Sequence, residues 1–210
     1  GRKESLDAIA DILKMKRHAI LVGPSRVGKS LTAKAFAKAL EQGDYPELSG
    51  MTVFRINTAD LIGQQASFLG GGNTILNKIS DGMGRFRSSI VLVLDEVHMA
   101  CKNGEKLADQ LKPFLDENGD FVHVIAITTD EEYELVRENT AFSLRFDRVD
   151  IGNTSKEETV RLLADTVLKS EFHPLISRDA LDYIVEETYG DEAAPQPAAS
   201  LKVLKQCITY

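Results

Sequence analysis

One eight-residue loop constrains this chain more than any other feature. Residues 23–30 read Gly-Pro-Ser-Arg-Val-Gly-Lys-Ser and fit the pattern GxxxxGK[ST] at each fixed position. The apolar run at residues 19–22 predicts a strand before the loop, and apolar residues at helical spacing predict a helix over residues 30–40. In this context the loop and the helix N-terminus direct backbone N–H groups at phosphate oxygens. The sequence therefore predicts a nucleoside triphosphate site.

Two side chains of the loop have specific expected roles. Lys29 supplies positive charge near the β- and γ-phosphates, and the hydroxyl of Ser30 is a ligand for Mg²⁺. A chance glycine turn before a helix is the alternative interpretation, and the full strand–loop–helix context disfavours it. The nucleotide-binding residues that we expect are Gly23, Pro24, Ser25, Arg26, Val27, Gly28, Lys29, Ser30 and Leu31.

A second motif supplies two carboxylates. The five apolar residues at 90–94 predict a strand buried on both faces, and Asp95 and Glu96 follow it directly. The carboxyl ends of parallel strands are where phosphate is bound in such folds. We expect Asp95 to hold the Mg²⁺ shell through water and Glu96 to be the base that polarises the attacking water. The alternative is a pair of surface acids at a strand end.

Strand-like and helix-like segments alternate through the first three quarters of the chain, which predicts a parallel sheet with helices on both faces. The expected strands are residues 19–22, 52–56, 90–94 and 122–128, and the expected helices are residues 6–15, 30–40, 74–83 and 106–115. After residue 152 three helices follow without a strand, the first opened by a capping box at Ser155 and Glu158 and the second capped by Ser177. We therefore expect an α/β nucleotide-binding subdomain at residues 1–152 and a small helical subdomain at residues 153–210.

Composition excludes several classes of protein. The 210 residues are 43% hydrophobic and 27% charged, which is ordinary for a globular chain with a core, and no apolar run approaches a membrane span. The formal charge of −7 argues against a large nucleic-acid footprint. Cys101 and Cys207 are isolated, and the four histidines lack metal-ligand spacing. We expect a cytoplasmic protein with no nucleic-acid and no membrane partner.

With both motifs placed, the chain resembles an AAA+ ATPase, and more narrowly the first nucleotide-binding module of the Clp unfoldases. The resemblance rests on several strings in one order. They are GRKESL at residues 1–6, QGDYPEL at 42–48, LKP at 111–113, TTDEEY at 128–133 and AFSLRF at 141–146, which are similar to the family's GRxxEL, QGDVPExL, LKP, TTxDEY and ALERRF.

The resemblance implies a P-loop NTPase fold and roles for three further residues. Thr129 falls on the polar sensor that reads the γ-phosphate and orients the attacking water. Arg145 falls on an arginine finger that acts on the nucleotide of a neighbouring subunit, and Phe68 on a pore-loop aromatic that grips a translocating polypeptide. The alternatives are an ordinary strand-end threonine, a surface ion-pair partner and a local packing residue.

The implied activity is ATP hydrolysis with Mg²⁺, which drives polypeptide unfolding or remodelling in a hexameric ring, with a peptidase as a further partner. The chain resembles an excised module of a longer protein, with its helical subdomain truncated at the C-terminus. We expect such an isolated module to be a weak ATPase. A DNA-directed motor such as a clamp loader is disfavoured by the acidic balance.

The chain departs from the family at four places, and two of them, Leu144 and the altered segment at residues 68–72, favour a rival function, a nucleotide-gated assembly module with little hydrolysis. Leu144 replaces the first of two arginines, and Arg26 replaces a usual glycine in the phosphate loop. The pore segment becomes Phe-Leu-Gly-Gly-Gly at residues 68–72, and Pro-Ala-Ala-Ser-Leu at 197–201 lacks the Asp-Lys pair of the family's PDKAI. The intact Lys29, Asp95 and Glu96 oppose that rival.

Overall fold

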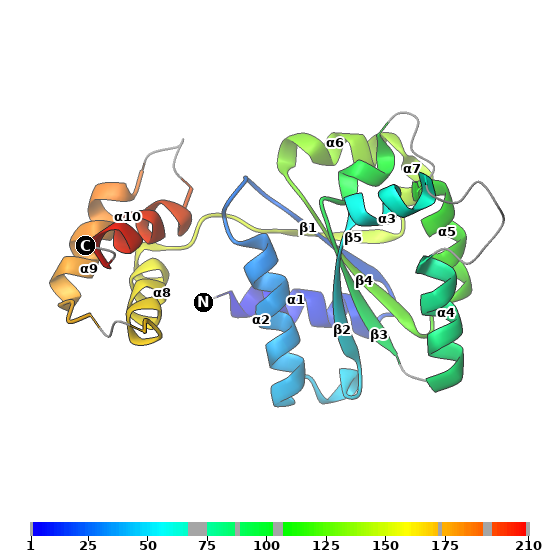
Figure 1. Cartoon of the computed structure of the whole chain (residues 1–210), viewed down its shortest axis with the longest axis horizontal. Coiled ribbons are helices and arrows are strands. Elements are labelled where there is room, and N and C mark those ends of the chain that lie inside the picture. The colour runs from blue at the N-terminus through cyan, green and yellow to red at the C-terminus, as the bar shows by residue number, and fades with distance from the viewer. Residues whose placement is uncertain are drawn as a thin grey trace. The chain divides into compact units, whose positions relative to one another are not determined.

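The computed structural model describes residues 2–66, 75–86, 89–102, 107–171, 174–190 and 195–208. These residues form two compact units. The larger unit holds residues 2–22 and 29–150, and the smaller unit holds residues 23–28 together with the described residues from 151 onward. Figure 1 shows the elements of both units. We retain the division at residue 152 as a proposal.

The larger unit is built on a five-stranded parallel sheet in the order β2-β3-β4-β1-β5. The strands are β1 (His18–Val22), β2 (Thr52–Asn57), β3 (Ile90–Asp95), β4 (Val122–Thr128) and β5 (Phe146–Asp150). The predicted parallel sheet is therefore confirmed. The central strands β1 and β4 are buried along their whole length, and β3 up to Asp95, which fits their mainly apolar sequences.

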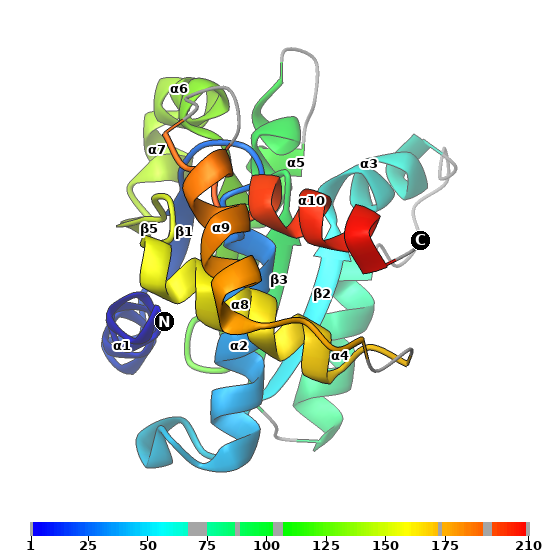
Figure 2. The same ribbon diagram turned by 90° about the vertical axis from the view of Figure 1, so that its left-hand side faces the viewer.

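Helices cover both faces of this sheet, as the sequence predicts. They are α1 (Lys3–Lys14), α2 (Lys29–Gln42), α3 (Thr58–Ala66), α4 (Ile75–Phe86), α5 (Leu107–Glu117), α6 (Asp130–Glu138) and α7 (Thr140–Ser143), with short 3₁₀ turns η1 (Pro46–Leu48) and η2 (Val97–Cys101). Figures 1 and 2 show α2 on one face, and α4 and α5 on the other.

The alternation of side chains along the strands decides which face each residue covers. Ile20, Leu92 and Val124 point to the face where α5 packs, and they share one core with Leu111 and Phe142. The strand residues between them, which include Leu21, Val93 and Ile125, are also buried and point to the opposite face. Because Asp95 follows Val93 by two positions, its side chain lies on the face opposite to the α5 core.

The smaller unit contains three helices, α8 (Lys156–Leu168), α9 (Arg178–Thr188) and α10 (Ala198–Ile208). Ser155 and Glu158 form the predicted capping box of α8, and Ser177 caps α9. The three helices share a core of Val160, Leu163, Leu181, Val185 and Leu204. Among the described residues, no helix is both long enough and apolar enough to cross a membrane.

Candidate active site

The phosphate loop connects the end of β1 to Lys29, the first residue of α2. Its backbone needs glycine at two points. A Cβ atom on Gly23 would lie 2.0 Å from the carbonyl oxygen of Ile151, and Gly28 has φ +100°. Arg26 also lies in the left-handed region, with φ +66°. The position at which the related family usually has glycine therefore has a backbone conformation that glycine adopts without strain.

Lys29 is a buried cation. Its side chain extends from the first turn of α2, and the residue is 8% exposed. Burial lowers the pKa of Lys29, and the carboxylates of Asp130, Glu132, Asp95 and Glu131 oppose that shift without cancelling it. Additional negative charge at this ammonium group, such as that of a phosphate, would stabilise its charged form further. The position therefore fits an anionic ligand.

Ser30 and Asp95 bring a hydroxyl and a carboxylate together. Asp95 is the last residue of β3, and its Oδ2 atom lies 3.3 Å from the Oγ atom of Ser30. Two neighbouring oxygen ligands of an octahedral Mg²⁺ ion lie about 3 Å apart, since each lies about 2.1 Å from the metal. These oxygens therefore fit Mg²⁺, as direct ligands or through water.

The donor set has the character of a nucleotide-dependent metal site. Among the residues that the structure describes, no group of three or more His, Cys, Asp or Glu side chains could hold a metal by itself. Mg²⁺ usually takes one or two protein oxygens, water and substrate phosphates, rather than a cage of protein ligands. Ser30 and Asp95 are therefore a sufficient protein contribution.

Two residues outside the sequence motifs also contact Asp95. The hydroxyl of Thr58 donates a hydrogen bond to the backbone oxygen of Asp95 at 2.6 Å. The guanidinium of Arg55, on the neighbouring strand β2, forms an ion pair with Oδ2 of Asp95. The signal for Arg55 is a charged residue within the strand segment Thr-Val-Phe-Arg-Ile-Asn, but only the strand register identifies its partner.

Glu96 has a strained backbone. It is exposed and has φ +56° and ψ +45°, the left-handed region that non-glycine residues rarely adopt. Such a conformation costs about 1–3 kcal/mol, and strained residues of this kind cluster at active sites. This conformation lies at the turn from β3 into η2, which begins at Val97. It therefore supports a functional role for the position of Glu96.

Thr129 follows β4 and caps α6. Its hydroxyl donates to Oε2 of Glu132 at 2.8 Å and accepts from the backbone N–H of Glu132 at 3.3 Å. Glu132 also lies 3.2 Å from Nδ1 of His98, whose pKa is lowered by burial. Thr129 thus has a structural role in addition to the sensor role that the resemblance implies, and the sensor role stays a prediction.

Arg145 lies at the other end of the sheet. It precedes Phe146, which pairs with the first residue of β1, whereas Asp95 ends β3. At about 3.3 Å per strand residue, the two ends are at least about 10 Å apart. The Nε and Nη2 atoms of Arg145 contact the carboxylate of Asp116 at 2.8 and 2.5 Å. In this chain Arg145 is an ion-pair partner, and its action on a neighbouring subunit stays a prediction.

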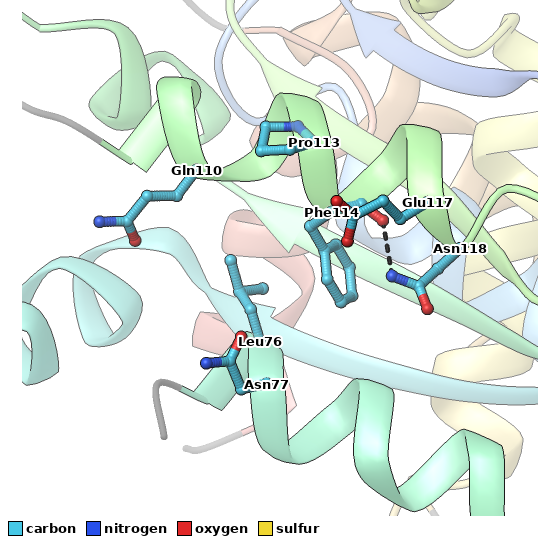
Figure 3. Close-up of a pocket in the computed structure, with 7 residues that line it drawn as sticks. All are labelled: Leu76, Asn77, Gln110, Pro113, Phe114, Glu117 and Asn118. Carbon is cyan, nitrogen blue, oxygen red and sulfur yellow. Dashed lines mark hydrogen bonds between the residues drawn. The ribbon is translucent and has the colours of Figure 1, made fainter. Parts of the chain in front are cut away.

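The remaining predicted site residues have separate positions. Leu31 is 58% exposed in the first turn of α2. Phe68 lies outside the described residues. A cavity of about 290 Å³ between α4 and α5 is formed by other residues, and Figure 3 shows its lining. The lining residues are Leu76, Asn77, Gln110, Pro113, Phe114, Glu117 and Asn118.

Residues 19–152 match the family described as "ATPase family associated with various cellular activities (AAA)". The chaperone protein ClpB of Meiothermus ruber is 29% identical over 181 residues, and this alignment covers 82% of the chain and 21% of ClpB. A ClpA homologue of Guillardia theta, named as the ATP-binding subunit of an ATP-dependent Clp protease, is 28% identical over 96% of the chain and 26% of that protein.

A solved structure of Hsp104 with ATPyS and FITC casein superposes with a TM-score of 0.86 at 25% identity, over 99% of this chain and 37% of that one. The chain therefore spans between about a fifth and two fifths of the length of these relatives. The five-stranded parallel sheet with helices on both faces, as the described residues form it, agrees with these similarities. The chain belongs to the AAA family of ATPases, and within that family it is a module of the Clp type.

Proposed function

We propose that this chain binds ATP together with Mg²⁺ and hydrolyses it to ADP and phosphate. The observation that carries the proposal is the arrangement at the start of α2. There the buried residue Lys29 precedes Ser30, whose hydroxyl oxygen lies 3.3 Å from Oδ2 of Asp95. A cation, a hydroxyl and a carboxylate at the C-terminal edge of a parallel sheet form a binding site for a metal-bound polyphosphate.

Each residue has one task in the proposed reaction. The backbone N–H groups of the loop and the Lys29 ammonium bind the phosphates, and Ser30 and Asp95 hold the metal shell. Mg²⁺, when bound, neutralises charge that develops on the phosphate oxygens. The carboxylate of Glu96 accepts a proton from the attacking water, and the hydroxyl of Thr129 orients that water.

The relatives support a wider proposal for the assembled protein. ClpB is named a chaperone, and the Hsp104 structure contains casein, a polypeptide. We therefore propose that copies of this module act in a hexameric ring that remodels polypeptides, with Arg145 acting across each subunit boundary. The name of the ClpA homologue, a subunit of a Clp protease, supports a peptidase as a further partner.

A second function is favoured by one observation. The guanidinium of Arg145 is held within its own chain by Asp116 and by the backbone oxygen of Ala141. If that ion pair persists in the ring, no finger reaches the next nucleotide, and the module would bind ATP as an assembly signal with little hydrolysis. The intact carboxylate pair of Asp95 and Glu96 favours hydrolysis.

The Lys29→Ala variant tests nucleotide binding. It removes the buried ammonium, so we expect ATP affinity to fall by about ten- to a hundredfold, the usual effect of losing a hydrogen bond to a charged group. Isothermal calorimetry measures this affinity. Lys34→Ala is the matched control, because Lys34 is exposed on the same helix. If the folded Lys29→Ala variant binds ATP like the parent, the site is assigned wrongly.

A further inference from the structure

The carboxylate of Asp95, which we propose as a Mg²⁺ ligand, already forms an ion pair with a side chain of the protein. The guanidinium of Arg55 contacts Oδ2 of Asp95. This is the same oxygen that lies 3.3 Å from the Ser30 hydroxyl. The positively charged guanidinium of Arg55 therefore contacts the same oxygen of Asp95 that would bind Mg²⁺.

The strand register explains how Arg55 reaches this oxygen. In the parallel pair of β2 and β3, Arg55 is level with Val93, and Asn57 is level with Asp95. Side chains two positions apart on a strand share a face, so Arg55 is the diagonal neighbour of Asp95 on the side of the sheet that Ser30 approaches. A residue one position earlier or later on β2 would point to the other face.

The two partners differ in their access to solvent. The Arg55 side chain is 63% exposed on an edge strand, whereas the Asp95 side chain is 16% exposed. The backbone of Asp95 is also held by the buried hydroxyl of Thr58. Arg55 can therefore move into water at low cost, while the carboxylate stays where it is. The ion pair has one mobile partner and one fixed partner.

We propose that Arg55 competes with Mg²⁺ for Asp95 and thereby sets the Mg²⁺ concentration at which the site fills. The proposal rests on the proposed nucleotide function. A guanidinium and a divalent cation on one carboxylate oxygen repel each other, so metal entry requires Arg55 to leave. In the metal-free chain the Arg55 guanidinium pairs with the Asp95 carboxylate. After the metal binds, the guanidinium is exposed to solvent instead.

The Arg55→Gln variant tests the competition, because it keeps a polar side chain and removes the charge. The measurement is the affinity for a fluorescent ATP analogue across a titration of Mg²⁺. We expect the Mg²⁺ midpoint to fall by about two- to fivefold, which corresponds to the loss of a largely exposed ion pair. Arg137→Gln is the control, since Arg137 is an exposed arginine that pairs with Glu134 at 3.0 Å. Its midpoint should equal that of the parent.

A second titration uses Mn²⁺ alone at millimolar concentration, because Ser30 and Asp95 without phosphate hold a divalent cation only weakly. Binding is followed by electron paramagnetic resonance and needs no nucleotide. Here Arg55→Gln should bind Mn²⁺ more tightly than the parent and Arg137→Gln should not. An unchanged or higher Arg55→Gln midpoint in both titrations overturns the proposal, provided that circular dichroism shows a folded variant. A parent that binds no nucleotide at any Mg²⁺ concentration contradicts the proposed function instead, and the Mn²⁺ titration then still decides whether Arg55 competes.

Discussion

Two non-glycine residues in the active-site motifs adopt left-handed backbone conformations, Arg26 in the phosphate loop and Glu96 after β3. Both are positions where the chain turns sharply between a strand and a helical segment. A residue there must keep its conformation at a cost of about 1–3 kcal/mol, so the surrounding structure has to impose it. For Glu96 the same strain fixes where the carboxylate leaves the backbone. The strained backbone at Glu96 therefore lies at the residue that we propose as the general base.

The Glu96→Gln variant separates binding from hydrolysis. Glutamine keeps the size and the backbone of Glu96 but accepts no proton, so ATP should remain bound at parent affinity. The hydrolysis rate should fall by about 10²–10⁴, the usual contribution of a general base. Calorimetry and phosphate release measure the two quantities. Parent-like turnover in this variant would remove Glu96 from the mechanism.

At the scale of elements, the sequence pattern predicted β1 to β4, and it did so most plainly for the strands whose burial is complete. β3 is a continuous apolar run up to Asp95, β4 is an apolar run interrupted by His123, and the capping residues Ser155 and Ser177 mark the starts of α8 and α9. The α2 helix follows directly from the loop pattern. These elements could be read from the sequence because their own residues determine them.

The edge strand β5 was not predicted, because its stability comes from distant partners. Two residues of its sequence Phe-Asp-Arg-Val-Asp are buried, and among the strands that the structure describes β5 pairs with β1 at the edge of the sheet. Arg17, next to β1, holds Asp147 through contacts of 2.5 and 2.8 Å. The contact of Arg55 with Asp95 was missed for the same reason, since it depends on the register of β2 against β3. Periodicity carries no information about such pairs.

Burial of His18 at the start of β1 should make stability depend on pH. His18 is 6% exposed, and its Nδ1 atom accepts a hydrogen bond from the backbone N–H of Val124 at 3.3 Å. Burial, with the nearby charges of His123 and Arg17, lowers the pKa of His18 from 6.5 to about 4. The unfolded chain therefore binds the proton more readily between these values, and the free energy of unfolding decreases as pH falls from 6.5 to 4.

The shift of His18 corresponds to a loss of about 3 kcal/mol across that range. Urea unfolding at pH 7 and pH 4.5 measures the change in unfolding free energy. In His18→Asn, the Oδ1 atom of the side chain can accept the same hydrogen bond, but the group does not titrate. This variant should lose less stability than the parent on acidification. An equal loss in both proteins would assign the pH dependence to other groups, such as His98 and His123, whose pKa values are also lowered by burial.

At the scale of the whole molecule, the role of Arg145 decides between the two proposed functions, ATP hydrolysis across a subunit boundary and ATP binding as an assembly signal. It lies at the N-terminal ends of the strands, whereas Ser30 and Asp95 meet at the C-terminal ends. A residue placed there serves its own nucleotide poorly, which agrees with the proposed action across a subunit boundary. Asp116, at the end of α5, holds the guanidinium in the single chain. The ring would therefore have to transfer Arg145 from Asp116 to a neighbouring phosphate.

The last prediction tests that transfer in the proposed ring. Arg145→Ala should lower ATP turnover by about 10³ or more and leave ATP affinity nearly unchanged, because a finger acts on charge that develops in the transition state. Asp116→Asn is the discriminating variant, since it removes the ion pair and keeps the arginine. If Arg145 matters only for the ion pair, both variants should lose turnover equally. If it acts across the boundary, Asp116→Asn should retain turnover, and mixing Arg145→Ala with Glu96→Gln subunits should restore activity at interfaces that join an intact finger to an intact base. Unchanged turnover in Arg145→Ala would favour the assembly function, in which ATP is bound as a signal and the Leu144 substitution marks the loss of finger chemistry.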